Sequence, residues 1–244
     1  MTNQFFTQSI QVQKIIKGFN LTKSLLVSSI LIGDFHIGKK SLVSYLFPNL
    51  VSVDGSNQEK VEEYIKNNDE LIITNFERLT NIESLDFTNK RVIAIANYMG
   101  NEKIIDNLFA FIYYMPPLKE RLEDVELLTQ IFLKEVQTNL VISQTLTIDT
   151  SRLDISNNSK SLKKSIYEQV FIRNCGAKEI EEILYHYLLE NLKGNNDYKE
   201  YLSLYEKPLI EAGLAKYGSQ LKLSNILGIN RNTLRKKIYE LNLD

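Results

Sequence analysis

LLVSSILIGDFHIGKKSLVSYL, residues 25–46, is the stretch of sequence that decides the fold class. Residues 25–32 form a short apolar run that is rich in β-branched side chains and ends at Gly33, a pattern typical of a buried strand. Residues 39–46 then resume with the apolar spacing of a helix. A buried strand, a loop with two glycines and a helix, in this order, predict one unit of an α/β domain.

Two further apolar runs extend this unit into a sheet. Residues 70–75 and 91–97 are both short and apolar, and helical segments are expected between the strands. A leading helix is expected within residues 9–27. Buried strands that alternate with helices favour a parallel sheet.

The second half of the chain is predicted to be helical. The pair Pro116-Pro117 ends the structure before it, and helical periodicity then runs through residues 120–136. Further helices are expected over residues 161–174 and 178–192. The polar, glycine-containing residues 193–197 are the best linker candidate.

Composition excludes several classes of protein. The 244 residues are 43% hydrophobic and 24% charged, as in a soluble globular protein, and no apolar run approaches the length of a membrane span. The single cysteine, Cys175, excludes an internal disulfide, and with only His36 and His186 in addition the sequence offers no metal-ligand cluster. We therefore expect a cytoplasmic protein without membrane contact or a metal site.

Positive charge is concentrated at the end of the chain. The formal net charge is -1, which gives the whole molecule no affinity for polyanions. Residues 216–244, however, contain six Lys or Arg and two acidic residues, a net charge of +4, so the remainder carries -5. A basic module therefore follows a mildly acidic body.

The basic module has the pattern of a helix-turn-helix. Gly228 lies in a turn between two short helices, and in the second helix Leu234, Ile238 and Leu241 share one face, which leaves the cations on the others. Such a helix fits the major groove of DNA. The expected elements are a helix over 198–217 that is broken once at Pro208, a short helix over 220–227, and a basic helix over 231–241.

Residues 228–238, GINRNTLRKKI, resemble the helix-turn-helix of the factor-for-inversion-stimulation (Fis) family. The resemblance implies binding to double-stranded DNA as a dimer, paired through the upstream helices, with two recognition helices in successive major grooves. The upstream helix carries more apolar surface than so small a module can bury alone, and this surface is expected to form the pairing through Leu202, Leu209, Ile210 and Leu214. The simpler alternative is a solvated basic helix. The candidate contacts to bases or phosphates are Asn230, Arg231, Thr233, Arg235 and Lys236, to which the charge pattern adds Lys237.

The loop between the first strand and helix has the spacing of a phosphate-binding loop. Gly33 and Gly38 bracket it, its backbone N–H groups could cradle phosphates, and Lys39 could reach the outer ones. Lys40 stands where such loops carry Ser or Thr, which removes one ligand of magnesium. ATP or ADP is therefore a candidate ligand of these four residues, and a tight strand-to-helix turn without a ligand is the alternative.

With residues 91–97 and 116–125, RVIAIAN and PPLKERLEDV, the loop resembles the AAA+ domain of bacterial enhancer-binding proteins, the nitrogen-regulator-type activators of the RpoN sigma factor. The resemblance implies a reduced AAA+-like P-loop sheet with a helical lid region and then an all-α Fis-type domain. The implied division is 1–135 for the AAA+-like domain, 136–193 for the lid-like region and 198–244 for the helix-turn-helix.

The departures from this family concern its chemistry. Thr74 and Asn75 stand where the family has the Asp-Glu pair that holds magnesium and positions water. Asn101 and Asn107 stand where the family has its arginine fingers, and Lys160 stands where the family has its lid arginine. Only 31 residues separate Lys39 from Leu71, too few for the inserted loop that touches the sigma factor.

The sequence thus predicts a DNA-binding transcriptional or nucleoid regulator that is no enzyme and has no catalytic residues. Its AAA+-like domain would serve as an oligomerisation, partner-binding or nucleotide-sensing scaffold in a nucleoid-associated homodimer or larger homo-oligomer. The alternative is a minimal ATP-binding or ATP-hydrolysing activator of the RpoN-dependent family, with Glu70 or Glu77 as its carboxylate. A third hypothesis, a pure interaction protein, is opposed by the intact basic helix.

Overall fold

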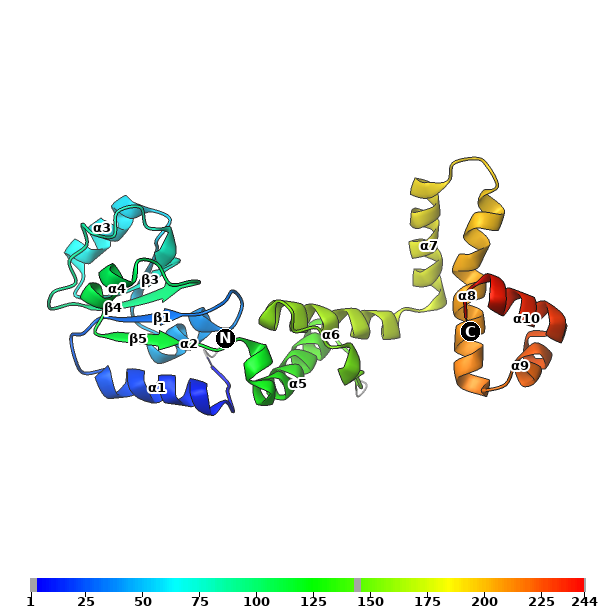
Figure 1. Ribbon diagram of the computed structural model, residues 1–244, viewed down its shortest axis with the longest axis horizontal. Coiled ribbons are helices and arrows are strands. Elements are labelled where there is room, and N and C mark those ends of the chain that lie inside the picture. Colours follow the sequence, from blue (N-terminus) through cyan, green and yellow to red (C-terminus); the bar gives the residue numbers. More distant parts are fainter. Residues whose placement is uncertain (1–3, 143–145, 244) are drawn as a thin grey trace. The chain divides into compact units, whose positions relative to one another are not determined.

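The computed structural model describes residues 4–142 and 146–243, which fall into two compact units, Met1–Asn174 and Cys175–Asp244 (Figure 1). Each unit has its own hydrophobic core. Within the described residues, no helix combines the length and the apolar character needed to cross a membrane.

A five-stranded parallel sheet forms the centre of the first unit. Its strand order is β2-β3-β4-β1-β5, so β1, whose four residues are all buried, lies inside the sheet. In register, Ile30 of β1 pairs with Ala94 on one side and Ile112 on the other. The strands are β1 (Ser29–Ile32), β2 (Val51–Asp54), β3 (Glu70–Thr74), β4 (Arg91–Ala96) and β5 (Phe111–Tyr114).

The sequence predicted the three inner strands and missed the two edge strands. β1, β3 and β4 have apolar centres because both of their faces are covered. β2 and β5 have one neighbour each, and Val51, Phe111 and Tyr114 are exposed. β2 is short and alternates apolar with polar residues, whereas β5 lies in the apolar run of residues 108–115, which the sequence analysis did not recognise as a strand. The predicted parallel α/β architecture is confirmed.

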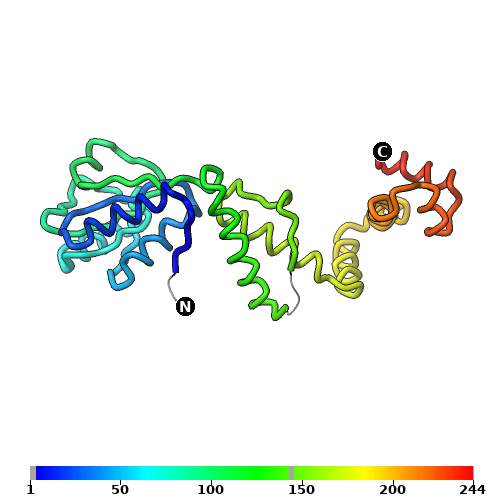
Figure 2. Tube along the Cα trace, turned by 90° about the horizontal axis from the view of Figure 1, so that it is seen from below, coloured from blue at the N-terminus to red at the C-terminus, as the bar shows by residue number. Residues whose placement is uncertain are grey.

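Helices cover both faces of the sheet (Figures 1 and 2). One core contains Val61 and Ile105 with Leu71 and Ile73 of β3, and the opposite core contains Phe19 with Ile72 of the same strand. Alternate residues of one strand therefore enter different cores. The covering helices are α1 (Ile10–Thr22) and α2 (Lys39–Leu46) on one face and α3 (Gln58–Asn67) and α4 (Glu102–Leu108) on the other.

A helical region completes the first unit. Helix α5 (Leu122–Asn139) packs against α6 (Asn158–Asn174), with Val136 and Leu162 in their common core. Residue 135, which the sequence analysis set as a domain boundary, lies inside α5. The helical region thus begins at residue 122 and stays with the sheet in one compact unit.

The second unit holds the helix-turn-helix. Ile210, Leu223, Leu234 and Ile238 are buried together, which places three helices around one small core. Gly218 and Gly228 each end a helix in the left-handed region, with φ of 68° and 67°. The helices are α7 (Ala177–Asn191), α8 (Asp197–Tyr217), α9 (Gln220–Leu227) and α10 (Arg231–Glu240).

Two expectations for this unit were wrong. Helix α8 continues through Pro208, so the break expected there does not occur. Residues 193–197 are a structured turn between α7 and α8, because the Asp197 carboxylate accepts hydrogen bonds from the backbone N–H groups of Lys193, Gly194 and Asn195. The division of the chain into two compact units falls instead between Asn174 and Cys175.

Gly213 allows α8 and α9 to approach closely. A Cβ atom at this position would lie 2.4 Å from Cδ1 of the fully buried Leu223. We therefore predict that Gly213→Val destabilises the helix-turn-helix by about 1–3 kcal/mol, the usual cost of overpacking a core. The faster amide hydrogen exchange of Leu223 and Leu234 would report it.

Ala212→Val is the matched control, because Ala212 is the exposed neighbour on the same helix and the substitution creates the same side chain. It should change exchange little. Equal effects of the two substitutions would show that helix propensity, and not close packing, decides the outcome.

Candidate nucleic-acid interface and nucleotide site

The N-terminus of α10 is fixed by Asn230. Its side-chain oxygen accepts a hydrogen bond from the N–H of Asn232 at 2.8 Å, which makes it the N-cap of the helix. Leu234 and Ile238 then anchor α10 in the core. The remaining faces of the helix are left to solvent.

A polar groove runs beside the exposed face of α10. Arg231 and Arg235 line it together with Gln220, Asn232 and Tyr239. Arg231, Arg235 and Tyr239 are spaced four residues apart and so form one stripe along the helix. The sequence analysis named the two arginines and missed Gln220, Asn232 and Tyr239, although the four-residue spacing from Arg231 points to Tyr239, which is 77% exposed.

The other predicted contacts differ in their surroundings. Thr233 and Lys236 are exposed, and Lys236 lies 3.7 Å from Glu240 in a solvent-screened pair. Lys237 is half-buried and donates a hydrogen bond to Glu206 of α8. This contact turns Lys237 toward α8, where it holds the recognition helix in place.

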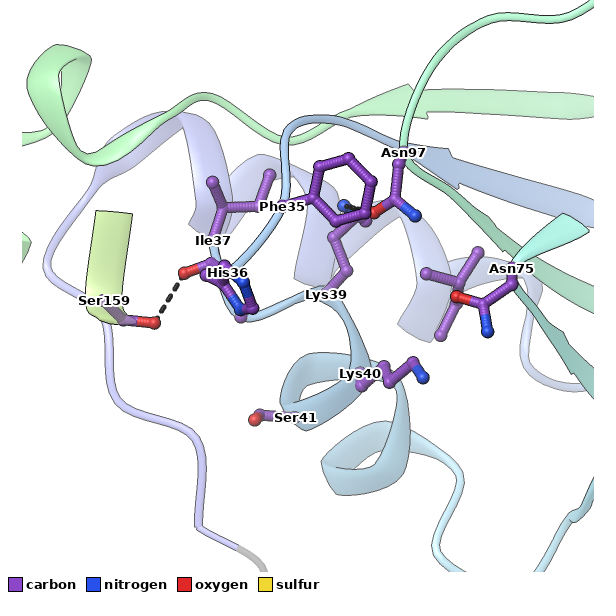
Figure 3. A pocket seen from close by; sticks show the side chains of 11 residues that line it. Phe35, His36, Ile37, Lys39, Lys40, Ser41, Asn75, Asn97 and Ser159 are labelled. Atoms are coloured by element: carbon purple, nitrogen blue, oxygen red, sulfur yellow. Dashed lines mark hydrogen bonds between the residues drawn. The ribbon is translucent and has the colours of Figure 1, made fainter. Parts of the chain in front are cut away.

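The phosphate-binding loop borders a cavity of about 390 Å³ (Figure 3). Left-handed backbone at His36 (φ 60°) and Gly38 (φ 98°) bends the loop into the first turn of α2, whose N–H groups have no acceptor within the helix. Gly33 permits close approach, since a Cβ there would lie 2.5 Å from the carbonyl oxygen of Met115. The lining residues are Phe35, His36, Ile37, Gly38, Lys39, Lys40, Ser41, Asn75, Ile95, Asn97 and Ser159.

Lys39 is bound to its own loop. Its ammonium group donates hydrogen bonds to the carbonyl oxygens of Gly33 and Asp34, the latter at 2.6 Å, and to Oδ1 of Asn97 at 3.1 Å. Burial lowers the pKa of Lys39 from 10.5 to about 8, an effect that the charges of Glu77 and Asp34 oppose. The ammonium is therefore cationic below about pH 8 and loses its charge above it.

The helical region donates hydrogen bonds to the next three carbonyl groups of the loop. The Asn158 amide donates to the carbonyl of Phe35 at 2.9 Å, the backbone N–H of Ser159 donates to that of His36 at 3.1 Å, and Arg121 donates to that of Ile37. The start of α6 and the residue before α5 thus hold the loop from outside.

Arg121 is itself held by a buried carboxylate. The Arg121 and Asp124 side chains are 2% and 0% exposed and lie 2.9 Å apart. Asp124 also accepts hydrogen bonds from the N–H groups of Gln8 at 2.6 Å and Ser9 at 3.2 Å. The sequence analysis did not single out these roles of Arg121, Asp124 and Asn158, because they depend on contacts between distant segments.

The two residues that replace the family's acidic pair, Thr74 and Asn75, lie beside the cavity and are bonded to β2. Asn75, in left-handed backbone, donates its amide to Asp54 at 2.8 Å, and the Thr74 hydroxyl donates to the Val53 carbonyl at 3.4 Å. Magnesium is usually held by carboxylates and ordered water. The described lining of the cavity has no carboxylate, and the described residues contain no group of three or more His, Cys, Asp or Glu suited to a metal.

Of the two carboxylates considered for catalysis, only Glu77 lies near the loop. It accepts hydrogen bonds from the backbone N–H and the side-chain amide of Asn97, the residue that also contacts Lys39. Glu70 begins β3, at the opposite end of the strand, and pairs with Arg91.

The residues matched to the arginine fingers and lid arginine lie outside the cavity lining. Asn101 caps α4 by accepting from the N–H of Lys103 at 3.2 Å. Asn107 and Lys160 are exposed.

Residues 201–241 match the model of the bacterial regulatory protein Fis family. The DNA-binding transcriptional regulator NtrC of Azospirillum brasilense is 30% identical over 166 residues, 53% of this chain and 34% of NtrC. NtrC of Rhizobium meliloti strain 1021 is 56% identical over 45 residues, 18% of this chain and 9% of that protein. A limonene hydroxylase of Geobacillus stearothermophilus is 28% identical over 175 residues, 66% of this chain and 32% of its own length.

Among solved structures, NtrX from Brucella abortus in complex with ATP has a TM-score of 0.54 at 13% identity, covering 98% of this chain and 70% of NtrX. The chain has an enhancer-binding-protein-like architecture. Its AAA+-like sheet and helical region precede a Fis-type helix-turn-helix. The chain spans about a third of the length of the A. brasilense NtrC and of the limonene hydroxylase.

The exposed stripe on α10 generates a prediction for DNA binding. Arg231→Ala should weaken binding to duplex DNA by about 1–3 kcal/mol and relax base preference, because a bidentate contact to guanine is lost. Arg78→Ala, which removes an exposed arginine from the first unit, is the control and should leave affinity unchanged. Fluorescence anisotropy at several salt concentrations measures both variants. Wild-type affinity in Arg231→Ala would refute the assignment of α10 as the recognition helix.

Proposed function

We propose that this protein is a DNA-binding transcriptional or nucleoid regulator whose AAA+-like domain binds ATP or ADP without hydrolysing it. The observation that carries the proposal is the exposed stripe of Arg231, Arg235 and Tyr239 on a Fis-type recognition helix. This arrangement fits the major groove, where arginine reads guanine edges.

Nucleotide binding is supported by the geometry of the loop. Left-handed glycine backbone, the free first turn of α2 and a lysine at its start are the features that bind phosphate in P-loop proteins. The structures of NtrX from B. abortus in complex with ATP and ADP share this chain's fold. The cavity is the place where we propose that Gly33, Gly38, Lys39 and Lys40 hold a nucleotide.

Loss of hydrolysis is supported by the missing carboxylates. An ATPase needs charged groups to hold the metal and to position water, and Thr74 and Asn75 are both neutral and bonded to the neighbouring strand β2. Loss of sigma-factor contact is supported by the same region of the chain. The helices and strand α2, β2 and α3 occupy most of residues 39–67, and the short turns between them leave no room for the family's inserted loop.

A minimal ATPase is the second candidate, and Glu77 is the observation that favours it. This carboxylate is linked to Lys39 through Asn97. In that case Glu77→Gln would abolish a magnesium-dependent turnover. In the function that we propose, Glu77 only positions Asn97, and there is no turnover to lose.

Nucleotide binding should depend on Lys39 and on pH. Lys39 is cationic below its pKa of about 8, so affinity for ADP should be full below that pH and should fall as the pH rises through it. Lys39→Ala should bind weakly at every pH. Calorimetric titration on either side of pH 8 measures this, and thermal unfolding checks that the variant is folded.

The same samples test hydrolysis. Phosphate release from ATP with magnesium should be equal for the wild type, Lys39→Ala and Glu77→Gln. Turnover that both substitutions abolish would establish the ATPase instead.

We also propose that the DNA-bound form is a homodimer, paired through α7 and α8. Helix α7 carries an apolar stripe of Ile180, Ile183, Leu184 and Tyr187, which are between 36% and 56% exposed. Its contacts with α8 include the Tyr187–Tyr201 ring pair and a hydrogen bond from the Tyr201 hydroxyl to the Asn191 carbonyl at 2.7 Å. An apolar stripe of this kind is typical of a surface that pairs with another chain.

This surface differs from the one that the sequence analysis used. Ile210 is 2% exposed and Leu214 packs against the same small core, so both serve the helix-turn-helix itself. Leu209 remains 36% exposed. The unpartnered apolar surface of the described second unit therefore lies mainly on α7.

A charge within the stripe should break the dimer. We predict that Leu184→Glu gives a monomer and weakens binding to a two-half-site duplex, because a buried unpaired carboxylate costs several kcal/mol. Tyr185→Glu, on the other side of α7 and 61% exposed, is the control and should stay dimeric. Light scattering with and without DNA measures the mass. A wild-type monomer that binds one half-site at full affinity would reject the dimer.

A further inference from the structure

The charges around the nucleotide cavity are unusual for a P-loop. Lys39 and Lys40 both line it, and its described lining residues include no carboxylate, although Glu77 and Asp34 act on Lys39 from outside the lining. A site of this composition attracts anions strongly. The inference drawn from it rests on the proposed binding of a nucleotide.

Lys40 reaches the place where a metal ion would be needed. It follows the loop lysine directly, at the position whose hydroxyl binds magnesium in P-loop proteins. Its side chain extends toward Asn75, whereas Ser41 points to the other side of the helix (Figure 3). Among the described residues that line this cavity on the Lys40 side, none carries a hydroxyl or a carboxylate, although Lys40 also borders a neighbouring pocket with Ser52 and Thr74.

The carboxylate of Asp54, which contacts Asn75, lies outside the cavity lining. Asp54 accepts hydrogen bonds from the N–H of Ser56 and the amide of Asn75, both at 2.8 Å. The bonds from Ser56 lower the pKa of Asp54, with smaller contributions from Asn75 and from the charge of Lys40. Asp54 is thus ionised and close enough to Lys40 to feel its charge, but it does not line the cavity.

We propose that this site binds a nucleoside di- or triphosphate free of divalent cation, with the Lys40 ammonium in the role of the metal. Lys39 and the N–H groups of α2 would contact the phosphates, and Lys40 would neutralise the oxygens that magnesium bridges in other P-loop proteins. Magnesium bound to the nucleotide opposes this arrangement. It removes negative charge from the phosphates and brings a second cation to the ammonium of Lys40.

The test is the effect of magnesium on nucleotide affinity. The full chain is titrated with ATP by calorimetry, once in EDTA and once in excess magnesium. We expect the wild type to bind ATP in EDTA and to bind it more weakly with magnesium. Lys40→Ser, which restores the hydroxyl of other P-loops, should lose about tenfold or more in EDTA, since a charge-assisted hydrogen bond to phosphate is removed. Magnesium should then strengthen its binding.

Lys14→Ser is the matched control, because Lys14 is exposed on α1 and remote from the cavity lining. It should behave as the wild type. Binding of ATP by the wild type only in the presence of magnesium would overturn this inference and leave nucleotide binding intact. Equal affinity of the wild type and Lys40→Ser in EDTA would overturn it too. Absence of binding in every condition, with Lys39→Ala indistinguishable from the wild type, would instead refute the proposed nucleotide function and the inference with it.

Discussion

The first unit depends on the buried ion pair between Arg121 and Asp124. Ahead of α1, Asp124 accepts hydrogen bonds from the Thr7 hydroxyl and from the backbone N–H groups of residues 8 and 9, and Arg121 donates to the loop at Ile37. One pair of charges thus joins three segments that are distant in sequence. Removing either partner would leave an uncompensated buried charge, which typically costs 3–5 kcal/mol. The position of the helical region against the loop is therefore set by this ion pair together with the hydrogen bonds from Asn158 and Ser159.

The second unit has a different basis for its stability. Its small core can pack closely because Gly213 lets α8 and α9 approach each other. Gly218 and Gly228 end their helices in left-handed backbone at no steric cost. The Lys237–Glu206 contact then connects α10 to α8 on the surface. These contacts fix α10 against α8 and α9, and such fixing is what the proposed base contacts of its arginines would require.

The elements that the sequence predicted correctly are those that a local pattern of apolar and turn residues determines. The inner strands, α2 and α9 were placed within a few residues because each is an apolar run or period bounded by glycine or a polar turn. β2 was missed because it is short and alternates apolar with polar residues, and β5 was missed although residues 108–115 are an unbroken apolar run. The break expected at Pro208 does not occur, because α8 continues through the proline with Ile210 and Gly213 buried on its inner face. Residues 193–197 were misjudged because the Asp197 carboxylate orders the turn. The contacts of Arg121 and Asn158 with the loop are long-range and have no local signal.

The loop's own hydrogen bonds constrain what a ligand can do there. Carbonyl groups from Gly33 to Ile37 each accept a hydrogen bond from Lys39, Asn158, Ser159 or Arg121, so each of these carbonyl groups has a donor within the protein. A phosphate that draws Lys39 away leaves the carbonyls of Gly33 and Asp34 short of a donor, a cost of about 1–3 kcal/mol for each buried group left unpaired. Ser159 lines the cavity and also donates to His36, so a ligand in the cavity contacts the residue that joins α6 to the loop. A nucleotide bound as proposed would therefore break hydrogen bonds within the loop and act directly on the junction between the loop and the helical region.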